Sequence, residues 1–205
     1  MSVYLSQALA LTLAATTDND AGIIGYDNLL TITNVAATSE AVNYPATNLA
    51  NPSTASFWRS AVTTTQYVTV NATGTADYVG LARHNLTAAT VSVESYNGST
   101  WSTVFAEQVL GSNAPAMLRF TSTAASGFRL KIQNATAEPE IAILYVGELL
   151  ELQRRIYVGH TPITYGRQTT VQSGRSESGN YLGRVILQER LSTSVQLENL
   201  TPNWY

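Results

Sequence analysis

Short runs of alternating apolar and polar residues occupy the middle of the chain, from about Tyr44 to Leu149. Alternation with a period of two residues is typical of antiparallel strands that have one buried and one solvated face. Turn-forming residues separate the runs, and the Asn97-Gly98 pair is a strong hairpin signal because both residues tolerate positive φ. The runs are QYVTVN (66–71), YVGLAR (78–83), TVSVESY (90–96), TWSTVF (100–105), MLRFT (117–121), GFRLKIQ (127–133) and IAILYVGEL (141–149). Seven short strands at this spacing predict an all-β fold, a sandwich or barrel.

The predicted strands place the sandwich at residues 44–149. The residues on either side predict two further parts of the chain, an entry segment over 1–43 and a C-terminal arm over 150–205. In the arm, glycines are frequent and apolar residues are sparse, although IYVG, ITYG, YLGRVILQ and SVQLEN each have the composition of a strand. Strands with so few apolar residues would struggle to close a core of their own. We therefore predict an extended β-rich arm that pairs with another surface. The alternative is that these strands extend the sheets of the same domain.

The composition supports a β fold and narrows the possible partners. The 205 residues include 27 threonines and a single lysine, Lys131, and threonine suits pleated, half-buried surfaces whereas lysine does not. A net charge of −3 gives no general attraction to nucleic acid or to anionic membranes. No apolar run reaches the roughly 18 residues that a membrane helix needs. We expect no nucleic-acid partner and no insertion into a membrane.

The sequence offers little for catalysis or for metal binding. It contains no cysteine, so thiol nucleophiles and cysteine-based zinc sites are excluded. The two histidines, His84 and His160, have no second ligand at helical or finger spacing, and there is no Gly-x-Ser-x-Gly elbow or glycine-rich phosphate loop. Glu138 and Glu140 flank Pro139, an arrangement that is more typical of solvated side chains than of a catalytic pair. We expect no enzyme activity, no cofactor and no metal.

One group of residues near the ends of the predicted strands suggests a shallow glycan site. Aromatic faces stack against the apolar faces of sugars, and arginine, histidine and asparagine supply hydrogen-bond donors for hydroxyl groups. The alternative interpretation is that the tryptophans pack in the core or at a sheet edge, while the arginines and the histidine solvate the rim. The candidate glycan-binding residues are Trp58, Arg59, Arg83, His84, Asn85 and Trp101.

Several motifs in a fixed order carry a resemblance that covers roughly residues 20–205. The series "NLANPSTASFWRS", "QYVTVNATGTADYVGLARHNL", "VSVESYNGSTW", "GFRLKIQ" and "IAILYVGELL" resembles a discoidin-like (galactose-binding-like) jelly roll. More narrowly, "IGYDNLL", the lead-in from Pro45 to Leu49, and "SGRSESGNYLGRVILQER" followed by "VQLENLTPNWY" resemble structural proteins of tailed bacteriophages. The disulfide that is usual in secreted discoidin domains is absent, as expected for a virion protein assembled in the cytosol.

The resemblance implies a structural component of a phage tail, in the distal tail or baseplate region. The chain would then be found in the virion, and in the host cytoplasm during assembly. Its partners would be other tail or baseplate proteins and copies of itself, reached by strand contacts through the arm. The alternative function is a carbohydrate-binding module that contacts host surface glycans. The residues that we expect to act in assembly are Tyr181, Leu182, Arg184, Ile186, Arg190 and Trp204.

Overall fold

A computed structural model describes residues 2–5, 22–152 and 165–194 of the 205-residue chain. The described residues fall into two compact units. The first unit contains residues 23–151 together with the N-terminal strand, and the second contains the described residues after Glu151 together with Gly22.

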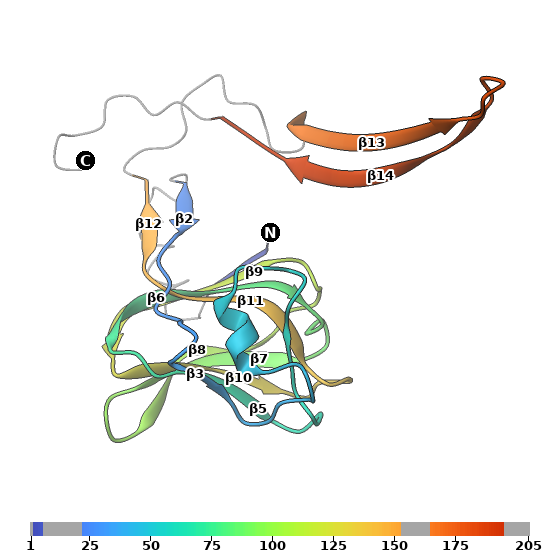
Figure 1. The fold of residues 1–205 in the computed structure, drawn as a ribbon. Coiled ribbons are helices and arrows are strands. Elements are labelled where there is room, and N and C mark those ends of the chain that lie inside the picture. Colours follow the sequence, from blue (N-terminus) through green and yellow to red (C-terminus); the bar gives the residue numbers. More distant parts are fainter. Residues whose placement is uncertain (1, 6–21, 153–164, 195–205) are drawn as a thin grey trace. The chain divides into compact units, whose positions relative to one another are not determined.

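The elements named among the described residues are nearly all strands, together with a short 3₁₀ helix, η1 (Figure 1). In chain order they are β1 (Ser2–Leu5), β2 (Ile23–Gly25), β3 (Val35–Ala37), η1 (Ala46–Ala50), β4 (Trp58–Arg59), β5 (Gln66–Val70), β6 (Gly74–His84), β7 (Thr90–Tyr96), β8 (Trp101–Val109), β9 (Ala116–Ala125), β10 (Gly127–Gln133), β11 (Glu140–Gly147), β12 (Leu149–Glu151), β13 (Arg167–Arg175) and β14 (Tyr181–Leu191).

The first unit is a sandwich of two five-stranded sheets, ordered β1-β9-β6-β11-β4 and β3-β5-β10-β7-β8. All pairings within these sheets are antiparallel except the one between β1 and β9. The predicted all-β antiparallel sandwich is therefore confirmed. Each of the seven predicted runs coincides with a strand over most of its length, and the last run, 141–149, covers most of β11 and ends at the first residue of β12. Strands β1 and β3 precede residue 44, and both pair with strands of the sandwich.

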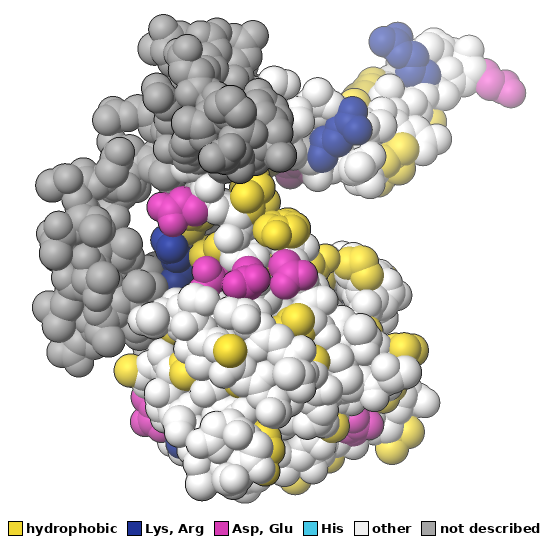
Figure 2. All heavy atoms as spheres, turned by 90° about the vertical axis from the view of Figure 1, so that its left-hand side faces the viewer, with side chains coloured by type: hydrophobic (Ala, Val, Ile, Leu, Met, Phe, Trp, Pro, Cys, Tyr) yellow, Lys and Arg dark blue, Asp and Glu magenta, His cyan; other side chains and the backbone are white. Residues whose placement is uncertain are grey.

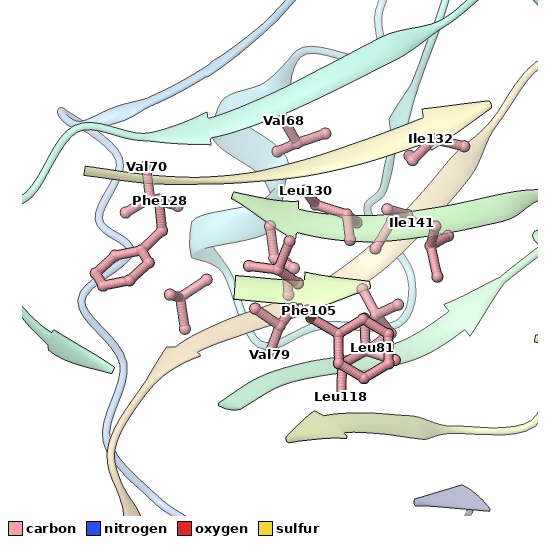
Figure 3. Close-up of a cluster of buried hydrophobic side chains, with 14 of the residues drawn as sticks. Val68, Val70, Val79, Leu81, Phe105, Leu118, Phe128, Leu130, Ile132 and Ile141 are labelled. Atoms are coloured by element: carbon pink, nitrogen blue, oxygen red, sulfur yellow. The ribbon is translucent and has the colours of Figure 1, made fainter. Parts of the chain in front are cut away.

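The alternating pattern places one face of each sheet in a shared apolar layer (Figure 3). In β5 the side chains of residues 66, 68 and 70 are buried and those between them are partly exposed. β10 alternates in the same way from Phe128 onward. The layer between the sheets contains Val68, Val70, Phe105, Phe128, Leu130 and Ile132 from one sheet and Val79, Leu81, Leu118 and Ile141 from the other. Full burial of each such side chain contributes roughly 1.5–3 kcal/mol to stability.

The segment that follows β2 is fixed to the end of β11 by backbone and side-chain bonds. Leu29 N donates to Val146 O at 2.7 Å, and Val146 N donates to the Asn28 Oδ1 atom at 3.1 Å. The buried hydroxyl of Tyr78 donates to Asp27 O at 2.6 Å. At Gly147 a Cβ would lie 2.6 Å from Asp27 O, so a side chain here would force the two segments apart. These contacts hold the entry and exit segments of the sandwich together.

The described part of the second unit consists mainly of an antiparallel hairpin formed by β13 and β14. Nearly every residue of the two strands is exposed. Register shifts occur after Thr170 and after Gly174, and Gly183 adopts a φ of 128°, which favours glycine. The predicted strand YLGRVILQ lies in β14, whereas β13 was not among the predicted strands. In the described part of the chain, no helix has the length and apolar character needed to span a membrane.

Trp58 lies in the core, at the start of the two-residue strand β4. Its side chain has no exposed surface, and its Nε1 atom donates to Ser39 O at 3.1 Å. Trp58 lies opposite Ile141 of β11, so it joins the long segment before β5 to the first sheet.

We expect Trp58→Ala to lower the free energy of unfolding by about 3–5 kcal/mol, because the change leaves a large cavity and an unpaired carbonyl. Trp101→Ala is the matched control, because Trp101 is only half-buried, and we expect it to cost clearly less. Denaturant unfolding of both variants measures the difference. Equal losses would contradict the assignment of Trp58 to the core.

Candidate functional site

Two of the predicted site residues, Arg59 and Arg83, meet around a pair of aromatic rings. The rings of Tyr44 and Phe57 stack with their centroids 4.6 Å apart. The guanidinium carbon of Arg59 lies 4.5 Å from the Tyr44 centroid and 5.5 Å from that of Phe57. The guanidinium carbon of Arg83 lies 4.8 Å from the Phe57 centroid. We call these four residues the arginine–aromatic cluster.

Backbone contacts of the long segment before β5 position the aromatic rings. Arg59 N donates to Tyr44 O at 3.3 Å, which places Tyr44 beside β4. The Nδ2 atom of Asn48, in η1, donates to Phe57 O at 2.9 Å. Arg59 is further held by Glu140 of β11, whose Oε1 atom accepts from its Nη2 atom at 2.6 Å and from its Nε atom at 2.7 Å. The charge of Arg59 is therefore neutralised, and its guanidinium is fixed in place.

Arg83 is the exposed member of the cluster, and it forms no ion pair among the described residues. Its φ is 48°, in the left-handed region that is uncommon for a residue with a side chain. Backbone strain of this kind is found frequently at ligand-binding positions. The cluster therefore presents one cation to solvent above an aromatic ring.

Asn85 lies next to the cluster and is hydrogen-bonded to the backbone at the start of β11. Its Oδ1 atom accepts from Glu140 N at 2.8 Å, and its Nδ2 atom donates to Glu138 O at 2.8 Å. Both ends of the amide are thus engaged by backbone. Asn85 positions Glu140, which in turn holds Arg59, so its observed role is to support the cluster.

His84 is buried and holds two loops together. Its Nε2 atom lies 3.0 Å from Ala114 O, and its Nδ1 atom accepts from Leu86 N at 3.3 Å. These partners place the ring proton on Nε2 in the neutral imidazole. Burial lowers the pKa of His84 below the ordinary value of 6.5, although the bond to Ala114 O opposes this shift. The ring has both nitrogen atoms occupied and is not presented to a ligand.

The two tryptophans do not join the cluster. Trp58 is in the core, so it offers no surface to a ligand. Trp101 lies opposite Tyr96 at the far end of β7, whereas Arg83 precedes the start of this strand. A strand of this length spans roughly 20 Å. The ring of Trp101 instead lies 4.2 Å from the guanidinium carbon of Arg129, which is also 4.2 Å from the Tyr67 ring and is paired with Glu94.

The cluster contains two residues, Tyr44 and Phe57, that the sequence analysis did not select. Tyr44 precedes Pro45, and Phe57 directly precedes Trp58. Two aromatic residues on opposite sides of a loop, with arginines nearby in the sequence, are a weak signal of a binding site. The contact between the two rings depends on how the loop folds, and the sequence does not show this.

The chemistry that this surface can perform is recognition. Guanidinium groups donate to hydroxyl or carboxylate oxygens, and partly exposed aromatic rings contact the apolar face of a sugar. The acid nearest the cluster, Glu140, is engaged by Arg59. Among the residues that the structure describes, no three histidine, aspartate or glutamate side chains gather as a metal site would require.

The architecture is that of a discoidin-like β-sandwich, and known structures show the same fold. Chitosan-binding module 1 of a chitosanase/glucanase from Paenibacillus sp. IK-5 aligns with a TM-score of 0.52 and 20% identity, over 59% of this chain and 98% of that one. Module 2 of the same enzyme, in complex with chitotriose, aligns at 0.50 and 24%, over 58% and 99%. The family 32 carbohydrate-binding module from Clostridium perfringens NanJ, in complex with galactose, aligns at 0.50 and 17%, over 57% and 92%.

The sequence itself matches no protein-family model and no curated protein. The structural likeness therefore establishes the fold. The alignments cover nearly the whole length of these modules but a little more than half of this chain. The chain therefore contains the equivalent of a whole module, together with further residues. The three structures named above are carbohydrate-binding modules, and none of the comparisons indicates a role in a phage tail.

We expect the buried His84 to make stability depend on pH. Because its pKa is lowered in the folded protein, the unfolded chain binds the proton more readily, and stability is lost as the pH falls through the unfolded value. The free energy of unfolding should therefore fall between about pH 7 and pH 5. In His84→Gln this part of the profile should be flatter, and since His160 is present in both proteins its titration cancels. Parallel profiles would contradict the prediction.

Proposed function

We propose that the sandwich is a carbohydrate-binding module and that its ligand contacts the arginine–aromatic cluster. The observation that carries this proposal is the position of the cluster, where an unpaired arginine stands beside stacked aromatic rings at one end of a discoidin-like sandwich. The similarity of the fold to modules whose complexes contain galactose or chitotriose supports the same function. A glycan on a cell surface would be the natural ligand.

Each member of the cluster has a separate role in this proposal. Arg83 donates hydrogen bonds to the ligand, because its guanidinium is exposed and has no ion-pair partner in the described part of the chain. Phe57 and Tyr44 provide apolar contact. Arg59 is held by Glu140 and orders the Tyr44 ring beneath it. The proposed role is binding and not catalysis, because Glu140, the acid paired with Arg59 in the described part of the chain, is held by that ion pair.

Arg83→Ala should weaken sugar binding by about tenfold to a hundredfold, because a hydrogen bond to a charged group contributes about 1.5–3 kcal/mol. Isothermal titration with a panel that includes galactose and chitotriose measures the affinity. Arg175→Ala is the matched control, since it also removes one exposed arginine, but from the β13–β14 hairpin. The melting temperatures should show that both variants are folded.

Trp101→Ala decides between the cluster and the region around Trp101 on the second sheet. Because Trp101 lies one strand length from the cluster, we expect this change to leave the affinity unaltered. A loss of binding in Trp101→Ala, with Arg83→Ala unaffected, would place the ligand around Arg129. Absence of binding to every sugar of the panel would contradict the proposed function.

A second candidate function, a structural component of a phage tail, is favoured by the exposed β13–β14 hairpin. Tyr181, Leu182, Arg184, Ile186 and Arg190 all lie on β14 with exposed side chains. Trp204, which was predicted to act with them, lies outside the described residues. One edge of β14 is paired with β13, and the other has no strand beside it among the described residues. A strand with one such edge and exposed apolar side chains is suited to strand addition in an assembly. The two functions are compatible, since an assembled module can also bind a glycan.

If this second candidate is correct, mass spectrometry should detect the chain in purified phage particles. Deletion of residues 173–205 removes β14 and part of β13, and we expect the truncated protein to be missing from particles while its sandwich still folds. Truncated protein present at the normal copy number would move the assembly surface onto the sandwich. Absence of the intact chain from particles would exclude the virion role.

A further inference from the structure

The β13–β14 hairpin exposes more apolar surface than an isolated ribbon can retain in water without a partner. Its large exposed side chains are Val171, Tyr181, Leu182, Val185, Ile186, Leu187 and Leu191. Within the described residues the sheet has only these two strands, so both outer edges carry backbone groups without a strand beside them. A two-stranded hairpin of this kind is marginally stable by itself. The hairpin therefore has the character of an interaction surface.

One face of the hairpin combines apolar and positively charged side chains. Val171 lies opposite Ile186, and Ser173 lies opposite Arg184. Arg175 lies opposite Tyr181. Opposite residues share a face, and so do alternate residues along a strand. We call this set of Val171, Arg175, Tyr181, Arg184 and Ile186 the cationic face.

The arginines of the cationic face are available for a partner. Neither Arg175 nor Arg184 forms an ion pair among the described residues, whereas Arg167 is paired with Glu189 at 2.8 Å. Residues 165–194 contain four arginines and two glutamates, which gives a net charge of +2. Two copies of this hairpin would repel each other, so the charges favour an acidic partner.

The sandwich has the opposite charge. Residues 22–151 contain five basic and nine acidic side chains, a net charge of −4. Three of the basic residues, Arg59, Arg129 and Lys131, are already paired with glutamates. The sandwich therefore has an excess of acids without a cation to balance them.

Part of that excess gathers where β11 leads into β12. Glu148 N lies 3.4 Å from the Asp27 Oδ2 atom, and Leu149 N donates to Asp77 Oδ1 at 2.8 Å, which brings three acids together. Glu151 follows in β12, opposite Ile23 of β2. We call Asp27, Asp77, Glu148 and Glu151 the acidic end. Exposed Ile24 and Tyr26 lie in the adjoining segment. Figure 2 shows acidic, apolar and basic side chains close together on this part of the surface, and the positive charge of Arg119 acts on Asp77.

We infer that the cationic face of one copy docks on the acidic end of a second copy of this chain. The two surfaces match in both respects, because each joins apolar side chains to an excess of charge of one sign and the two signs are opposite. Reciprocal docking satisfies both hairpins at once, so the smallest closed assembly is a two-fold dimer. A dimer carries two sandwiches and would bind a multivalent glycan with avidity. The association itself does not rest on the proposed sugar binding.

Sedimentation velocity of the full chain, without sugar, tests the inference. We expect a dimer whose dissociation constant rises with salt, since exposed charge pairs are screened. Arg175→Glu/Arg184→Glu should weaken the dimer at least about tenfold. Glu138→Lys is the control, because it reverses an exposed acid that is not part of the acidic end, and it should leave association unchanged.

A charge exchange then identifies the partner surface. Glu148→Lys/Glu151→Lys should weaken self-association as strongly as the hairpin variant does. An equimolar mixture of the two variants should form a heterodimer, because the reversed hairpin of one matches the reversed end of the other. A monomeric full chain, or a mixture that stays monomeric, would overturn the inference. Neither outcome would bear on sugar binding, which is measured separately.

Discussion

The apolar layer between the two five-stranded sheets is the constraint on which the remaining structure depends. Water is excluded from this layer, so each polar group at its margin must find a partner inside the protein. Trp58 Nε1 bonds to Ser39 O, and the side chain of Gln66 bonds to Ser39 Oγ and to Thr64 O. These bonds hold the long segment before β5 against the sandwich. The position of Tyr44 and Phe57, and hence of the arginine–aromatic cluster, follows from them.

Three of the five basic side chains in residues 22–151 are neutralised by glutamates on the sheets of the sandwich. Arg129 of β10 pairs with Glu94 of the neighbouring strand β7, and Lys131 of β10 pairs with Glu107 of β8, one strand further along the sheet. Such pairs contribute little to stability when exposed, but they leave the outer face of this sheet nearly neutral. Three of the described cations without an ion pair, Arg83 in the sandwich and Arg175 and Arg184 in the hairpin, belong to the two surfaces that we propose for recognition. Arg119 and Arg190 also form no ion pair among the described residues, and they lie outside these surfaces.

The strands of the sandwich were predictable because apolar and polar residues alternate along them. This pattern did not reveal strands whose conformation depends on pairing with another strand. GFRLKIQ and TVSVESY were predicted at their observed bounds, since their apolar residues recur at every second position. β13, RQTTVQSGR, was missed because Val171 is its one large apolar residue, and its strand conformation depends on pairing with β14. Strand β4 was missed because its two residues are too few for any pattern.

The candidate site was predictable in part, for a related physical reason. Arg59 and Arg83 were selected as donors near strand ends, and the pairing of β11 with both β4 and β6 brings them together. Trp101 was grouped with them by residue type, although the direction of β7 carries it to the other end of the sandwich. His84 has the side chain of a ligand-binding residue, but burial and two backbone partners give it a structural role. Residue type suggested the chemistry, and strand direction decided which residues meet.

The proposed function requires that a sugar binds at the arginine–aromatic cluster of the sandwich. It is tested by a titration of the ¹⁵N-labelled protein with chitotriose and with galactose, followed by the chemical shifts of the backbone amides. We expect the largest changes on Phe57, Arg59 and Arg83, with the amides of Tyr67, Trp101 and Arg129 unmoved. Changes centred on Trp101 and Arg129, or no saturable change with either sugar, would contradict the proposal.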